Sequence, residues 1–93
     1  MKKQYELTII ADPDMDYRES NDKIETVINK YECEIEQKWH DGKKRLAYPI
    51  NNKEIGIYVS YNINMPEENA NKLSKELDDM ENVIRYLLVR VMK

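Results

Sequence analysis

The residues with the clearest potential for chemistry form one continuous run, Lys43-Lys44-Arg45-Leu46-Ala47-Tyr48-Pro49-Ile50. Three adjacent cations where a loop meets a strand can contact phosphate oxygens, and the apolar strand beside them would fix where they point. Pro49 lacks a backbone N–H, which argues against an ordinary central strand. The same residues also fit a solvated turn followed by a core strand. The run therefore predicts either a phosphate-binding surface or a plain loop.

Other residue types that could act chemically are poorly placed for it. His40 and Asp41 are neighbours, but no nearby Ser or Cys nucleophile accompanies them, so they do not predict a catalytic triad. Aspartates alternate at positions 12–16 as in a calcium loop, yet the glycine and distal glutamate of such a loop are missing, and we expect turn formers and a helix start. Gly42 and Gly56 are the only glycines, which excludes a Gly-rich phosphate loop. The sequence predicts no enzyme, no metal site and no cofactor.

Length and composition predict one domain spanning residues 1–93, because 93 residues with 41% apolar content can enclose a single core. The single cysteine, Cys33, excludes an internal disulfide and fits a small buried hydrophobe. No apolar run is long enough to span a membrane, and the first residues carry charge where a signal peptide would be apolar. We therefore expect a cytoplasmic protein without a membrane partner.

The charges are distributed unevenly along the chain. The net charge is −3, and acids dominate residues 12–36, whereas cations dominate residues 38–53. Smaller basic groups lie at the two ends of the chain, at Lys2, Lys3, Arg85, Arg90 and Lys93. If the ends and the middle segment meet in the fold, a basic surface forms on a protein that is acidic overall.

Periodicity predicts four strands and two helices. Strands are expected at about 4–11 and 55–65, a helix at about 16–31, and a long bulged strand or a hairpin from Ile35 to Ile50 with a bend at Gly42. A turn is expected at 51–54, a second helix from Pro66 to about 78 or 79, and a last strand over 83–92. The order strand, helix, strand, strand, helix, strand predicts an α+β ferredoxin-like βαββαβ fold, a four-stranded antiparallel sheet with two helices on one face.

Such a fold leaves one sheet face open. Residues 83–92 are apolar on both alternating sides, which indicates either a partner protein on the open face or ordinary exposure of strand-forming residues. Residues 56–61 faintly match the base-stacking strand of RNA-recognition domains, but Ile55 occupies the position of the usual basic residue. Recognition of RNA backbone and shape by Lys and Arg fits better.

Several runs, in the right order, resemble a known family. They are Tyr5-Glu6 followed by Pro13, the run from Gly42 through Ile50, Gly56-Ile57-Tyr58, Met65-Pro66-Glu67, and Val83-Ile84-Arg85-Tyr86-Leu87-Leu88-Val89. Over essentially its whole length the chain is similar to bacterial small-subunit ribosomal protein six. The resemblance implies a ferredoxin-like structural protein that binds the central domain of small-subunit rRNA cooperatively with ribosomal protein eighteen.

The resemblance also implies roles for individual residues. The RNA-binding candidates are Lys43, Lys44, Arg45 and Arg85, followed by Lys2, Lys3 and Arg90. The candidates for contact with the protein partner are Tyr48, Tyr58, Leu87 and Val89.

Two functions of other classes stay open on the residues alone. Ferredoxin-like domains also form homodimers that sense small molecules, which would predict self-association and stabilisation by a ligand. A small acyl-phosphate hydrolase on the same fold ranks last, because acids at residues 12–16 would repel phosphate where that enzyme needs an anion loop.

Overall fold

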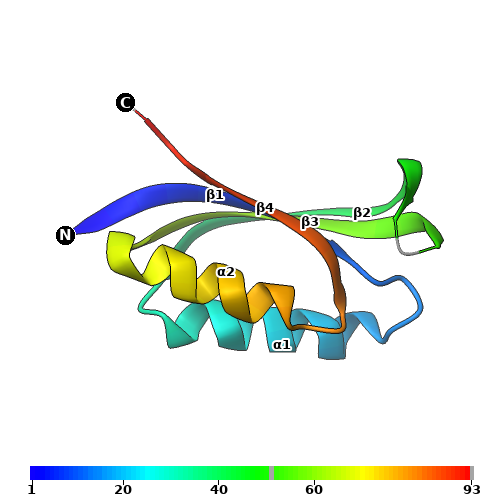
Figure 1. Ribbon diagram of the computed structural model, residues 1–93, viewed down its shortest axis with the longest axis horizontal. Helices are drawn as coiled ribbons and strands as arrows, with labels where there is room; N and C mark the ends of the chain where they lie inside the picture. Colours follow the sequence, from blue (N-terminus) through cyan, green and yellow to red (C-terminus); the bar gives the residue numbers. More distant parts are fainter. Residues whose placement is uncertain (51, 93) are drawn as a thin grey trace.

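The computed structural model describes residues 1–50 and 52–92. Its elements are β1 (Lys2–Ala11), α1 (Tyr17–Lys30), β2 (Glu34–Ile50), β3 (Lys53–Pro66), the 3-10 turn η1 (Glu67–Asn69), α2 (Ala70–Asp78) and β4 (Val83–Arg90). The strands form one antiparallel sheet in the order β2-β3-β1-β4, and both helices cover the same face of it (Figure 1). The predicted ferredoxin-like arrangement is confirmed.

The core lies between the helices and the sheet. Alternate residues of β1 and β3 point into it, as the period of two requires. The helices contribute Ile24 and Ile28 from α1 and Leu73 and Leu77 from α2, all at most 1% exposed. Burying each such side chain contributes about 1.5–3 kcal/mol, so these four side chains hold the helices on the sheet.

The structure corrects the start of the second helix. Pro66 is the last residue of β3, opposite Lys2, and its ψ angle of 136° is extended. Helical structure begins with η1, and α2 starts only at Ala70. Elsewhere the differences are small, since β1 begins two residues early and β4 ends at Arg90. The predicted turn at 51–54 includes Asn51, which lies outside the described residues.

β2 is the long bulged strand, and the alternative of a hairpin within residues 35–50 is wrong. β2 has 17 residues and pairs with β3 from Glu34 to Arg45 and again at Ile50, and the register shifts at three places. One shift lies between His40 and Gly42, where Gly42 has a φ of +81°. A glycine adopts this left-handed conformation without the steric cost of a Cβ atom. β2 and β4 are thus the two edges of the sheet.

Candidate nucleic-acid and partner interface

The end of β2 curls away from the helices, toward the open face of the sheet, which the helices leave uncovered (Figure 1). Leu46 is only 7% exposed, although it does not belong to the helix-side core. A Cβ atom at Gly56 would lie 2.3 Å from Ile10 Cγ2 and 3.4 Å from Leu46 Cδ2. Leu46 and Ile10 therefore meet above Gly56, and only glycine leaves room for this contact.

This bend brings the Tyr48 side chain within reach of a side chain on β4, the opposite edge of the sheet. The Arg85 guanidinium on β4 donates a hydrogen bond from Nη1 to the hydroxyl oxygen of Tyr48 on β2, at 3.0 Å. β3 and β1 lie between these two strands. Tyr48, predicted to contact the protein partner, is thus hydrogen-bonded to Arg85, predicted to contact RNA.

The three adjacent cations of the run do not form one cluster. Lys44 pairs with Gly56 on the open face, and its Nζ lies 5.5 Å from the centre of the Tyr58 ring, a cation–π arrangement. Lys43 pairs with Ile57, whose side chain points to the helix side. Arg45 is exposed. The predicted basic surface is therefore divided between two faces of the hairpin.

Lys43 lies near a second cation on the helix side, Lys53, and both line a groove with Pro13 and Asp14. The Lys53 ammonium donates to the Asp14 carboxylate and also lies 3.7 Å from Asp12. This hydrogen bond, followed by the charge of Lys53, lowers the pKa of the Asp14 carboxyl below its ordinary value. Carboxylates thus oppose the cations on this side, whereas Lys44 and Arg85 lie against tyrosines.

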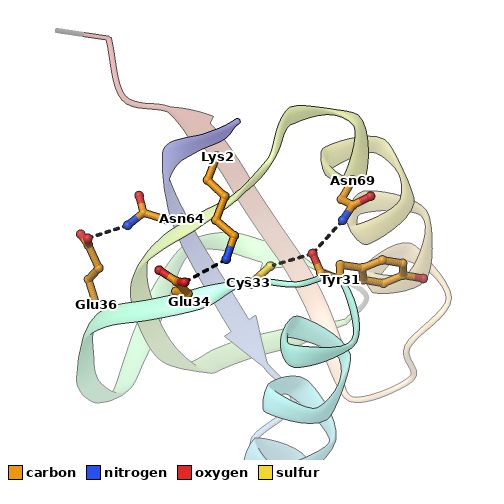
Figure 2. Close-up of polar contacts among 7 residues, drawn as sticks. All are labelled: Lys2, Tyr31, Cys33, Glu34, Glu36, Asn64 and Asn69. Atoms are coloured by element: carbon orange, nitrogen blue, oxygen red, sulfur yellow. Dashed lines mark hydrogen bonds and ion pairs between the residues drawn. The ribbon is translucent and has the colours of Figure 1, made fainter.

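Two of the predicted cations near the chain ends, Lys2 and Arg90, are also paired with acids. The Lys2 ammonium lies 2.9 Å from Glu34 (Figure 2), and Arg90 lies 2.7 Å from Glu67. Lys3 is half-buried, with its Nζ 3.7 Å from the sulfur of Met1. Exposed ion pairs are weak, so these cations remain able to exchange partners, but their charge is locally compensated.

The predicted partner-contact residues share the open face. Leu87 is 62% exposed and pairs with Thr8, and Val89 is 44% exposed and pairs with Glu6. Tyr48 is 61% exposed. The alternate residues of β4, such as Leu88, pack against the helix-side core, which resolves the ambiguous parity of this strand.

Trp39 is an open-face residue that sequence reasoning missed. It pairs with Ser60 and is 44% exposed. The bulges of β2 interrupt the alternation that would have assigned its face. Between the apolar edges the face is polar: Asn64 donates to Glu36 at 2.5 Å (Figure 2), and Asn62 donates to Gln37 at 3.3 Å.

The remaining reactive residue types have structural roles. Cys33 is 9% exposed, with its Sγ 3.6 Å from the sulfur of Met65, and burial raises the pKa of its thiol to about 11. The ring of His40 lies 4.4 Å from that of Tyr17. Within the described residues, no group of three His, Cys, Asp or Glu side chains could hold a metal ion.

The predicted role of the aspartates at positions 12–16 is confirmed. Asp12 Oδ1 accepts the backbone N–H of Asp14 at 2.9 Å, which closes a turn. Asp16 caps α1, because its Oδ1 accepts the backbone N–H of Glu19 at 2.9 Å. In the part of the chain that the structure describes, no helix is long and apolar enough to cross a membrane.

Fold and surface together define a small α+β binding protein with cations and exposed apolar side chains on an open sheet face. The model of the family "Ribosomal protein S6" matches residues 4–90. Small ribosomal subunit protein bS6 of Trichodesmium erythraeum is 38% identical, over 92% of this chain and 76% of that protein. The bS6 of Corynebacterium efficiens is 37% identical, over 98% of this chain and 99% of that protein. This chain belongs to the ribosomal protein S6 family.

Solved structures agree on the fold. The crystal structure of 30S ribosomal protein S6 from Thermotoga maritima superposes with a TM-score of 0.88 at 19% identity, covering 98% of this chain and 89% of that one. The P2 domain of the chemotaxis kinase CheA from the same organism, solved with CheY, superposes at 0.68 with 14% identity, covering 98% of this chain and 100% of that one. At these identities the likeness concerns the fold alone.

Family membership defines the general role. The protein is a structural, non-enzymatic component of the bacterial small ribosomal subunit, associated with ribosomal RNA and located on cytoplasmic ribosomes. The predictions of a ribosomal protein and of a non-enzyme are confirmed.

Proposed function

We propose that this protein binds the central domain of small-subunit rRNA cooperatively with ribosomal protein eighteen, and that residues 1–93 act as one domain. The observation that carries the proposal is the open face, where Lys44 and Arg85 lie against tyrosine side chains while Leu87 and Val89 are exposed. Cations suited to phosphate and apolar residues suited to a protein thus share one surface.

The RNA contacts are assigned to the predicted cations in an order that follows their pairing. Lys44, Arg45 and Arg85 rank first, because among the described residues no carboxylate lies within ion-pair distance of them, and because Lys44 and Arg85 lie against open-face tyrosines while Arg45 is exposed. Lys43 supports them from the helix side of the hairpin. The weaker contributors are Lys2, Lys3 and Arg90, whose interactions with Glu34, Met1 and Glu67 must first be exchanged.

The partner contacts are assigned to Tyr48, Tyr58, Leu87 and Val89. Tyr48 and Tyr58 also touch Arg85 and Lys44, so a protein that covers the tyrosines restricts the two cations to fewer conformations. Fewer conformations mean a smaller entropy loss when the cations bind RNA. This is a physical route to cooperativity.

The protein alone is expected to bind RNA weakly. Its net charge is −3, and three or four neutralised phosphates support only micromolar or weaker affinity, on the order of non-specific binding at physiological salt. The test is filter retention of a central-domain rRNA fragment with this protein, with ribosomal protein eighteen, and with both. Binding that appears or tightens sharply only in the mixture supports the proposal. If the mixture binds no better than its parts, cooperative binding is refuted, and the small-molecule-sensing homodimer is tested next.

A further inference from the structure

The two edges of the sheet differ in their capacity to accept another strand. β2 shifts register three times and carries Pro49 together with the charged residues Glu34, Glu36, Lys38, Asp41, Lys43, Lys44 and Arg45. Bulges, charges and proline on an edge oppose the addition of a further strand. In β4 the only charged residues are Arg85 and Arg90. β4 is therefore the edge suited to strand addition.

The backbone of β4 has hydrogen-bonding groups that point away from the sheet. The N–H of Val91 donates to the carbonyl oxygen of Gln4 at 2.9 Å, so residue 91 faces β1. Because backbone groups alternate along a strand and the pairing continues in register, residues 87 and 89 also face β1. The N–H and C=O groups of Tyr86 and Leu88 then point outward. Among the described residues they have no backbone partner, and an added strand would supply one.

A groove of about 460 Å³ follows this edge. Its lining includes six consecutive residues, Val83 through Leu88, and three from α2, Ser74, Leu77 and Asp78. Successive residues of a strand point to opposite faces, so six in a row can line a groove only if it runs along the strand edge. An extended segment fits that shape.

The chemistry of the groove defines the occupant. On the helix side the groove offers the partly exposed side chains of Tyr86 and Leu88 and the carboxylate of Asp78. On the open face, Leu87 and Val89 would flank the added strand. An extended segment with apolar side chains on both sides and a lysine or arginine near Asp78 is complementary to this edge.

We propose that the protein partner docks by pairing an extended segment with the outer edge of β4, an inference that rests on the proposed function. The strand's side chains on one side continue the apolar surface of Leu87 and Val89, and those on the other side enter the groove beside α2. This mode of binding, β-augmentation, draws affinity from the backbone and specificity from the alternate side chains. It accounts for the apolar character of both faces of β4.

The first experiment is amide hydrogen exchange by NMR on this protein, free and in an equimolar mixture with ribosomal protein eighteen. In the free protein the amides of Tyr86 and Leu88 should exchange faster than those of Leu87 and Val89, which face β1. In the mixture the amides of Tyr86 and Leu88 should slow by about tenfold or more, as expected for hydrogen bonds that open only with the complex. Amides of α1, which lies on the helix side and outside the groove lining, serve as the internal control and should keep their rates.

Each other result contradicts the inference in a distinct way. If the complex forms but Tyr86 and Leu88 exchange as before, strand pairing is refuted while the proposed function stands. If no complex forms, the proposed partner and the pairing fail together. If protection develops in this protein alone with rising concentration, a second copy occupies the edge instead of the partner.

A pair of variants tests the groove separately. Asp78→Lys reverses the charge in the groove and should weaken the complex by roughly fivefold, as measured by isothermal titration. Asp79→Lys makes the same change one residue later, outside the groove lining, and should change affinity by less than about twofold, as for a charge away from the contact. Equal losses for the two variants would mean that general charge, and not the groove, is responsible.

Discussion

The hydroxyl of Tyr48 accepts a hydrogen bond from Arg85 across the open face of the sheet, although their strands form opposite edges. The contact holds the curled end of the β2–β3 hairpin over the face and fixes the direction of a guanidinium that has no carboxylate partner among the described residues. We therefore predict that Tyr48 acts on RNA binding through the position of Arg85.

Tyr48→Phe removes this acceptor and keeps the ring. We expect the affinity of the mixture with ribosomal protein eighteen for the rRNA fragment to fall by roughly fivefold, the order of one exposed charge-assisted hydrogen bond. Filter retention measures the effect. The matched control is Tyr17→Phe, on the helix side, which should leave the affinity unchanged. Identical affinities for the Tyr48 and Tyr17 variants would show that the Arg85 contact plays no part in RNA binding.

Gly56→Ala should destabilise the protein by about 1–3 kcal/mol, because overpacking forces neighbouring atoms apart. The new Cβ would lie 2.3 Å from Ile10 Cγ2, so adding Ile10→Ala should recover part of the loss. Gly42→Ala is the matched control: its φ is +81° and no atom lies within 4 Å, so its cost is backbone strain. Urea unfolding of each glycine variant, alone and combined with Ile10→Ala, gives the coupling energy between that position and Ile10. A positive coupling for Gly42 as large as that for Gly56 would contradict the close contact.

Reversing the charge of Lys43, Lys44 and Arg45 together to Glu should abolish RNA association of the complex and leave the melting curve normal. Unchanged RNA affinity with normal melting would refute the assignment. Single reversals separate the faces: Lys44→Glu should reduce the salt dependence of binding by about one phosphate contact, and Lys43→Glu should reduce it less. Lys72→Glu on α2, remote from the open face, is the control.

Stability should depend on Cys33 at alkaline pH. Burial raises the pKa of the folded thiol to about 11 from an ordinary value of 9.0. Because the folded state holds the proton more tightly, the contribution to stability is complete below pH 9 and is lost as the pH rises toward 11. The difference in unfolding free energy between the natural protein and Cys33→Ala, from urea titrations, should therefore shrink over this range. A difference that stays constant from pH 8 to 11 would mean that the thiol is accessible to solvent.

The order and type of the elements could be predicted because they depend on local periodicity. The alternation in β1 and β3 and the apolar stripe of α1 are visible in the sequence. The start of the second helix could not be predicted so well, since Pro66 suits both the first turn of a helix and the last residue of a strand. Its pairing with Lys2, 64 positions earlier in the chain, decided the outcome.

The site was less accessible from the sequence, because its geometry depends on irregularities of β2. Each bulge changes which residues share a face, so the alternation predicts that Lys43 and Lys44 separate but does not predict which of them lies on the open face, nor that Trp39 lies there. The approach of Tyr48 to Arg85 requires the whole hairpin to bend over the sheet. The sequence did predict that Leu87 and Val89 lie on the same face of β4, as one of its two alternating sets of apolar residues.

The irregular, charged β2 edge has a consequence for how copies of this protein can aggregate. Continuous fibrils need two adhesive edges on each molecule, so that every added unit presents a fresh one. Here only β4 is regular and largely apolar. Two molecules that paired through β4 would form a dimer with two-fold symmetry, in which neither molecule has a free regular edge. Growth of the sheet therefore terminates after one addition.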